Sequence, residues 1–136
     1  MELTAEAFRG RWALERAIDD RRAGEAGRFT GEAVLTGEGE ALRYREEGLL
    51  TLGGRAPLKA ARVYLWELSG GRLRMFFEDG RAFHEVTGEA PAALHPCGED
   101  LYRVRYNFAQ WPEWRAVWEV SGPRKDYRMD TRYRRL

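Results

Sequence analysis

Cysteine and histidine are scarce in this chain of 136 residues, which contains one cysteine, Cys97, and two histidines, His84 and His95. A single cysteine excludes a disulfide within the chain, and no cysteine and histidine pairs have zinc-finger spacing. We therefore expect no cofactor and a reducing compartment, the cytoplasm.

Long apolar runs and an excess of charge of one sign are also missing. No stretch approaches the about 18 apolar residues of a membrane span, and the first residues lack the basic and apolar parts of a signal peptide. Lysine and arginine number 23 against 22 aspartate and glutamate, a net charge of +1. Such balance creates no field for nucleic acid or anionic lipid, so neither is expected as a partner.

Alternation with a period of two residues is the dominant pattern that is present. In residues 125–134, Lys125, Tyr127, Met129 and Tyr133 share one parity, and charged residues occupy the other. This period is typical of a strand with one buried face. The same period, interrupted by Gly-Gly, Asp-Gly and Gly-Pro turns, predicts ten strands: 12–19, 28–36, 41–52, 61–69, 72–78, 81–87, 92–95, 100–108, 113–121 and 125–134.

Short connections between these strands predict an all-β, up-and-down antiparallel arrangement. A meander of this length would expose its edges unless it closed, so we expect a β-barrel of about ten strands whose last strand pairs with the first. Before it, Thr4 is placed to cap a short helix that ends near Phe8. Residues 1–136 are expected to form one domain.

The expected barrel interior is partly polar. Eight strands make a barrel that side chains just fill, so ten favour a cavity. Parity places Tyr44, Glu46, Tyr102, Lys125 and Tyr127 on the inner face, where a purely structural core would carry aliphatic residues. In the strand 61–69 the pattern leaves both faces possible: either Arg62, Tyr64 and Trp66 point inward, or Val63 and Leu65 do.

The first strand begins with Gly10-Arg-Trp12, directly after the short helix. This beginning resembles that of the calycins, the lipocalins and their relatives. The resemblance implies a lipocalin-like barrel closed at one end by the helix, with an arginine of the last strand packed over the tryptophan. Arg132 and Arg134 are the candidates for that arginine.

Several further segments resemble a bacterial family catalogued only as a domain of unknown function. The resemblance covers residues 8–134 and implies a barrel fold but no activity. The segments that carry it are 8–12 with Arg16, 42–48, 62–66, 79–84, 95–100 with Tyr102, and 122–127.

Ten residues on strands or strand ends are candidates for a ligand site. An arginine with tyrosine hydroxyls recognises a carboxylate or phosphate. We therefore expect a barrel that binds a small amphipathic or anionic molecule and performs no catalysis, with its oligomeric state open. The candidates are Arg62, Tyr64, Trp66, His84, His95, Asp100, Tyr102, Trp118, Lys125 and Tyr127.

Three alternatives remain open at this point. His84 or His95 with Asp100 could supply acid–base chemistry or ligate a metal, if the fold brings them together. Trp111 and Trp114 flank a turn that could contact a partner protein. An outward-facing Arg62 in a surface ion pair, with tyrosines that only cap the barrel ends, would leave a purely structural barrel.

Overall fold

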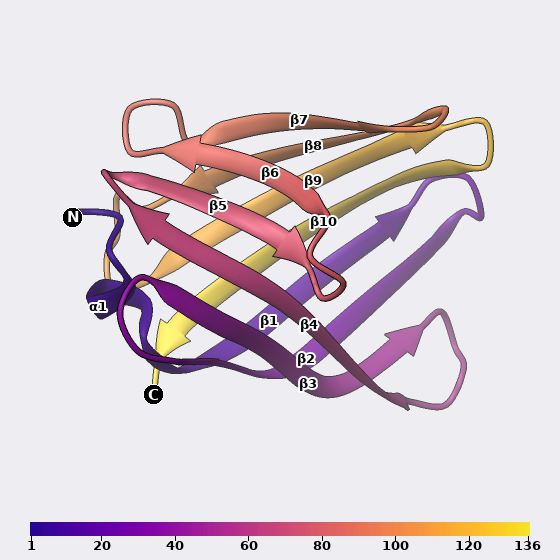
Figure 1. Cartoon of the computed structure of the whole chain (residues 1–136). Helices are drawn as coiled ribbons and strands as arrows, with labels where there is room; N and C mark the ends of the chain where they lie inside the picture. The colour runs from indigo at the N-terminus through magenta and orange to yellow at the C-terminus, as the bar shows by residue number, and fades with distance from the viewer.

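The computed structural model describes residues 1–136 as ten antiparallel strands and one short helix (Figure 1). All ten predicted strands are present. Their bounds are α1 (Ala5–Phe8), β1 (Gly10–Asp20), β2 (Glu25–Thr36), β3 (Ala41–Leu52), β4 (Leu58–Ser69), β5 (Arg72–Phe77), β6 (Ala82–Thr87), β7 (Ala92–Cys97), β8 (Asp100–Asn107), β9 (Trp114–Gly122) and β10 (Lys125–Arg135). No helix in the structure is long and apolar enough to cross a membrane.

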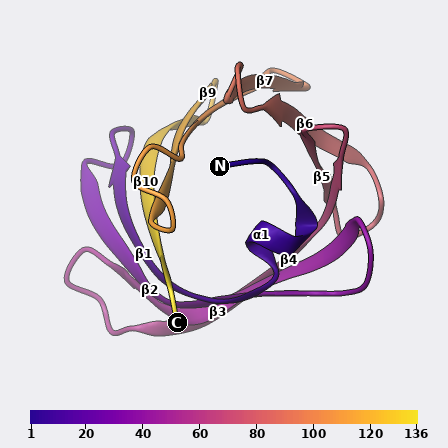
Figure 2. The ribbon, with the colours of Figure 1, turned by 90° about the vertical axis from the view of Figure 1, so that its left-hand side faces the viewer.

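The strands form one sheet that curls into a nearly closed barrel (Figures 1 and 2). β1 pairs with β10, as predicted, and every other consecutive pair is hydrogen-bonded except β6 and β7. Side chains bridge this seam instead. His84 Nε2 on β6 lies 2.7 Å from the Tyr106 hydroxyl on β8, and the rings of Phe83 and His95 are 5.2 Å apart.

Helix α1 lies inside one mouth of the barrel (Figure 2). Thr4 caps it, since its hydroxyl accepts a hydrogen bond of 3.2 Å from the Ala7 N–H, and Leu3 and Phe8 are buried on either side of this cap. The Phe8 ring packs edge-on against Trp66 and Trp114, at centroid distances of 5.3 and 5.4 Å. The helix therefore closes this end with an aromatic layer.

An arginine of β10 packs over Trp12, but it is Arg135. Its guanidinium carbon lies 3.9 Å from the Trp12 ring centroid, and its nitrogens donate to the Arg9 and Ala7 carbonyls. The prediction of Arg132 or Arg134 was wrong. Successive side chains of a strand alternate between faces, and Arg135 shares the inward face of β10 with Tyr133, whereas Arg132 and Arg134 do not.

The inward faces predicted by alternation are otherwise confirmed, and the structure decides the uncertain strand. Arg62, Tyr64 and Trp66 of β4 line the interior. Parity fails on β6, where the pairing with β5 shifts from Met75–His84 to Phe76–Ala82 and leaves Phe83 as an extra residue. A bulge of this kind re-aims side chains, so that Phe83 and His84 are both buried.

Two facing glycines let β2 and β3 approach closely beside the interior. Gly31 pairs with Gly48, and a β-carbon on either would lie 2.0–2.2 Å from a backbone oxygen of the opposite strand. No larger residue fits at either position without moving the backbone, because this distance is far inside van der Waals contact. The close approach lies two residues from Glu46 on β3.

Candidate functional site

A cavity of about 250 Å³ occupies the barrel interior. It extends from the aromatic layer at α1 toward the opposite, open end of the barrel. Most of the lining is apolar or aromatic, with a few polar and charged groups. The lining residues are Arg16, Tyr44, Glu46, Arg62, Tyr64, Trp66, Met75, Phe77, Phe83, Cys97, Tyr102, Tyr106, Trp114, Ala116, Trp118, Lys125, Tyr127, Met129 and Tyr133.

Arg62 stands at the open end of the cavity without an acidic partner. Its side chain is exposed, and no carboxylate lies within 4.0 Å of it. The guanidinium carbon lies 5.6 Å from the centroid of the Tyr64 ring, a cation–π arrangement that holds it toward the cavity wall. The donors of Arg62 are thus free for an anion.

Lys125, on the same rim, is a cation whose charge is already balanced by a carboxylate. Its ammonium donates to the Tyr102 hydroxyl at 2.9 Å and lies 3.1 Å from a carboxylate oxygen of Asp100. These hydrogen bonds, first that to Tyr102 and then that to Asp100, raise the pKa of Lys125. Gly122 makes room for this pair, because a β-carbon there would lie 2.0 Å from an Asp100 oxygen.

Deeper in the wall, Arg16 and Glu46 form a bidentate ion pair across three strands. Arg16 Nη1 and Nη2 donate to the two Glu46 carboxylate oxygens at 2.7 and 2.9 Å, and Arg16 Nε donates to Thr131 Oγ1 at 2.8 Å. The side chains are 15% and 6% exposed, so the pair is largely removed from water. The paired charges cancel within the wall.

Two tyrosines extend this pair into a directed hydrogen-bond chain. Tyr44 donates to Glu46 at 2.7 Å, so its oxygen must accept from Tyr133, whose hydroxyl lies 2.8 Å away. Burial raises the pKa of Glu46, but the hydrogen bonds and charge of Arg16 outweigh it and the net shift is downward. Burial raises the pKa of Tyr44 and Tyr133. Glu46 is therefore an anion and both tyrosines are neutral at pH 7.

The site carries one uncompensated positive charge. Arg16, Arg62 and Lys125 supply three cations, and Glu46 and Asp100 supply two anions, of which each contacts its own cation. Arg62 is the cation left over. The electrostatics of the cavity therefore favour an occupant with a single negative charge near the open end.

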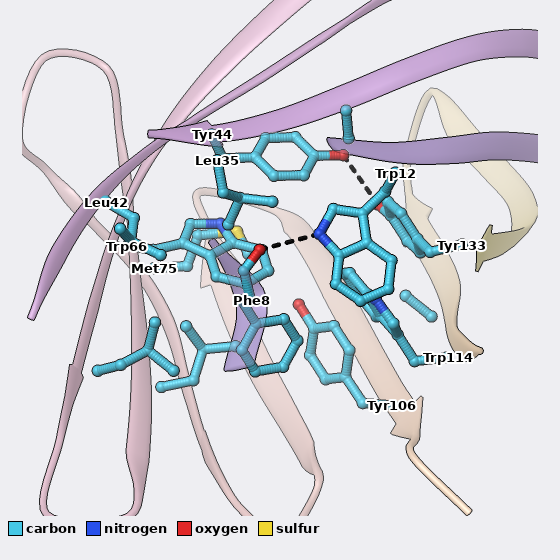
Figure 3. Packing of buried hydrophobic residues seen from close by; sticks show 14 of the residues in the cluster. Phe8, Trp12, Leu35, Leu42, Tyr44, Trp66, Met75, Tyr106, Trp114 and Tyr133 are labelled. Carbon is cyan, nitrogen blue, oxygen red and sulfur yellow. Dashed lines mark hydrogen bonds between the residues drawn. The ribbon is translucent and has the colours of Figure 1, made fainter. Parts of the chain in front are cut away.

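The floor of the cavity consists of indole and phenol rings around Phe8 (Figure 3). Trp66 stacks on Tyr44 at 5.4 Å, and Trp114 stacks on Tyr133 at 3.7 Å. The buried Nε1 atoms of Trp66 and Trp114 have no hydrogen-bond acceptor, whereas Trp12 Nε1 donates to the Phe8 carbonyl at 2.9 Å. Two N–H donors are thus buried in the aromatic layer without a partner.

Seven of the ten predicted site residues line one cavity. The other three, His84, His95 and Asp100, lie beside it. His84 is buried behind Trp118 and bonded to Tyr106, and His95 packs against Phe83 in the seam. Asp100 does not line the cavity but forms an ion pair with Lys125, which does. The predicted residues that line the cavity are Arg62, Tyr64, Trp66, Tyr102, Trp118, Lys125 and Tyr127.

The geometry does not assemble the histidine chemistry that was one alternative. His84 and His95 contact aromatic rings, and neither lines the cavity that holds Arg62. No three histidine, cysteine, aspartate or glutamate side chains lie close enough together to hold a metal ion. The two histidines act in the packing of the β6–β7 seam.

The turn with Trp111 and Trp114 also packs inward. Trp114 is buried, and the half-buried Trp111 contacts Phe8 at 5.1 Å and Trp12 at 5.5 Å. These rings complete the aromatic layer at the α1 end. They are not displayed for a partner protein.

Sequence reasoning missed Arg16 as a site residue. Its parity with Trp12 and Leu14 places it on the inward face of β1, where a charge needs a partner. Glu46, predicted to be inward on β3, was the one carboxylate available at a similar depth. The signal was therefore present as two opposite charges on the inner faces of β1 and β3, which are separated by β2 alone.

A comparison with family models matches residues 8–135 to a family of unknown function, DUF6314. No curated protein matches the chain. Among solved structures, the chain is similar to an S-type phycobiliprotein lyase, CPES, from Guillardia theta, with a TM-score of 0.59 and 11% sequence identity. The match covers 95% of this chain and 87% of the lyase chain, and it supports the lipocalin-like barrel fold.

Proposed function

We propose that this chain, which belongs to the DUF6314 family of unknown function, binds a small molecule with an apolar body and one anionic group inside its barrel. The observation that carries the proposal is Arg62, a guanidinium without a carboxylate partner at the open end of an aromatic-lined cavity. Guanidinium groups bind carboxylates and phosphates in a bidentate manner. The apolar lining below Arg62 suits the body of such a ligand.

The size of the cavity limits the ligand. Small-molecule sites usually enclose about 300–1,000 Å³, and this cavity of about 250 Å³ is at or below the lower end of that range. We infer a ligand smaller than a drug-sized molecule, such as a medium-chain or single-ring carboxylate.

The fold supports a binding role without specifying the ligand. The similar solved structure is named a phycobiliprotein lyase, but at 11% identity it shares the barrel alone with this chain. The lining residues of this chain decide what it binds. We further propose that it acts in the cytoplasm, for which its single free thiol, Cys97, is suited; cell fractionation would test this.

Substituting Arg62 by glutamine is expected to weaken the binding of octanoate about 10- to 100-fold, measured by isothermal titration calorimetry at pH 7. Hydrogen bonds to charged groups contribute about 1.5–3 kcal/mol, and R62Q loses the charge of one partner. The uncharged analogue octanamide should bind the wild-type protein and R62Q with similar affinities.

Arg28 provides the matched control. It is an exposed arginine of β2 that has no carboxylate within 4.0 Å and does not line the cavity. R28Q changes the net charge by the same amount and should leave octanoate affinity unchanged. Equal losses in R62Q and R28Q would attribute binding to overall charge and contradict a site at Arg62.

Native mass spectrometry after incubation with a metabolite extract identifies the natural ligand. The expected spectrum contains a complex of the protein with a small anion, which R62Q weakens. A wild-type protein that emerges without any bound species would argue against the proposed function.

A further inference from the structure

We propose that the outer face of β8, β9 and β10, which lie side by side in the sheet (Figure 1), binds an acidic, extended peptide segment of a partner protein. This face is on the outside of the barrel wall, so the inference goes beyond the proposed function. Its basis is a surface groove of about 990 Å³. We name it the arginine groove, after its lining residues Arg103, Arg105, Arg115 and Arg128.

The strand pairing arranges the side chains of the arginine groove in rows. Arg103 and Arg105 alternate along β8 with tyrosines that line the cavity, so they point outward. In one row, Arg103 pairs with Glu119 of β9, which pairs with Arg128 of β10. In the next row, Arg105 pairs with Val117.

The outward arginines of this face differ from those elsewhere because most of them lack a carboxylate partner. On β8, β9 and β10, only Arg115 and Arg128 lie within 4.0 Å of a carboxylate oxygen. On β1 to β6, every outward arginine except Arg28 has such a partner. The partnered arginines of β1 to β6 are Arg11, Arg43, Arg45, Arg72 and Arg74. The unpartnered arginines of β8 and β10 are Arg103, Arg105, Arg132 and Arg134, all of them exposed.

The carboxylates near the arginine groove are already engaged. Glu119 accepts a hydrogen bond of 2.6 Å from Arg21 and lies 3.4 Å from Arg128, and Asp130 accepts from Arg115. Neither carboxylate is therefore free to balance a further arginine. Positive charge remains on this face although the whole chain is almost neutral, and such a patch attracts an acidic partner.

Arg103 and Arg105 are the centre of the proposed site. Arg132 is less suited, because Glu15 of β1 is its cross-strand neighbour and forms no other ion pair within 4.0 Å. Residues two apart on a strand are separated by about 6.6 Å. Alternate side chains of an extended peptide have the same spacing, so two glutamates separated by one residue can face both arginines.

The composition of this face favours a peptide over a nucleic acid. The outward positions of β7 to β10 include no aromatic side chain on which a base could stack. Glu119 and Asp130 also stand among the arginines, where they would repel a continuous row of phosphates. The acidic side chains of a peptide can be spaced to avoid these two carboxylates.

Fluorescence anisotropy with a labelled short peptide of alternating glutamate and threonine tests the inference. R103Q/R105Q should bind this peptide about fivefold more weakly than the wild type, because the variant loses two exposed ion pairs. Raising the ionic strength from about 0.01 to about 0.15 M shortens the screening length from about 30 to about 8 Å, so it should weaken binding too. In NMR spectra, the methyl signals of Leu94 and Val117, which line the groove, should shift on binding.

R28Q/K59Q is the matched control. It removes the same charge from exposed, outward positions of β2 and β4 that have no carboxylate within 4.0 Å and do not line the groove. It should bind the glutamate peptide as the wild type does. R103E/R105E should instead prefer the same peptide with lysine in place of glutamate. Thermal melts verify that each variant is folded.

Three results would overturn the inference. They are a wild type that does not bind the glutamate peptide at low ionic strength, equal losses in R103Q/R105Q and R28Q/K59Q, and tighter binding of an oligothymidylate of equal charge, which would assign the face to nucleic acid. The proposed function is tested separately. Arg103 and Arg105 do not line the cavity, so R103Q/R105Q should bind octanoate as the wild type does.

Discussion

Replacing Glu46 by alanine is expected to lower the free energy of unfolding by about 3–5 kcal/mol, the usual cost of removing one partner of a buried ion pair. Arg16 would then be left 15% exposed with no carboxylate to accept its two hydrogen bonds. Tyr44 would lose its acceptor too. Urea denaturation of both proteins at pH 7 measures the difference.

The surface pair of Arg11 and Glu32 serves as control for E46A. It also joins β1 to another strand, but its side chains are 60% and 48% exposed. Exposed pairs contribute about 0–1 kcal/mol, so E32A should have a small effect. The double substitution R16M/E46L should recover most of the loss, because it removes both buried charges. Equal effects of E46A and E32A would contradict the burial of the Arg16–Glu46 pair.

Acid is expected to destabilise the protein through His84 by about 2 kcal/mol between pH 7 and pH 5. Burial, with a smaller effect from the charge of His95, lowers the pKa of His84 to about 3 from its ordinary value of 6.5. Below about pH 6.5, His84 therefore binds a proton in the unfolded chain, whereas His84 in the folded chain stays neutral. The free energy of unfolding therefore decreases as the pH is lowered, by about 1.36 kcal/mol for each pH unit well below 6.5.

Urea denaturation at pH 7, 6 and 5 measures this slope in the wild type and in H84F, which keeps a ring of similar size but does not titrate. H84F should lose the slope. In the folded wild type, the His84 ring signals in NMR should not shift between pH 7 and pH 5. A His84 that titrates near pH 6.5 in the folded protein would contradict its burial behind Trp118.

The fold was predictable from the sequence because each strand follows the two-residue period and each turn has distinctive chemistry. The pairing of β1 with β10 followed from the need to cover edges. The location of the seam between β6 and β7 did not follow. Nor did the bulge at Phe83, an insertion of one residue in the pairing of β6 with β5 that alternation alone cannot reveal.

The site was predictable in composition but less so in geometry. In β4, both faces combine apolar and polar side chains, so no contrast in polarity along the sequence marked Arg62 as inward. In the structure, the residues of β4 are mostly exposed or half-buried on both faces. His84 and His95 were candidates because histidine is rare in this chain and titrates near neutral pH. These properties indicate a functional role only when the side chain reaches a cavity, and neither histidine lines the cavity. The unpaired donors of Trp66 and Trp114 could not be foreseen, since pairing depends on three-dimensional neighbours.

A crystal structure of the protein with octanoate would show directly whether the barrel interior is a binding site. We expect the acid inside the barrel, with its carboxylate within hydrogen-bond distance of the Arg62 guanidinium and its chain directed toward Trp66 and Trp114. Octanoate bound on the outer face of the sheet, or a barrel whose side chains close over the interior and exclude it, would refute binding inside the barrel.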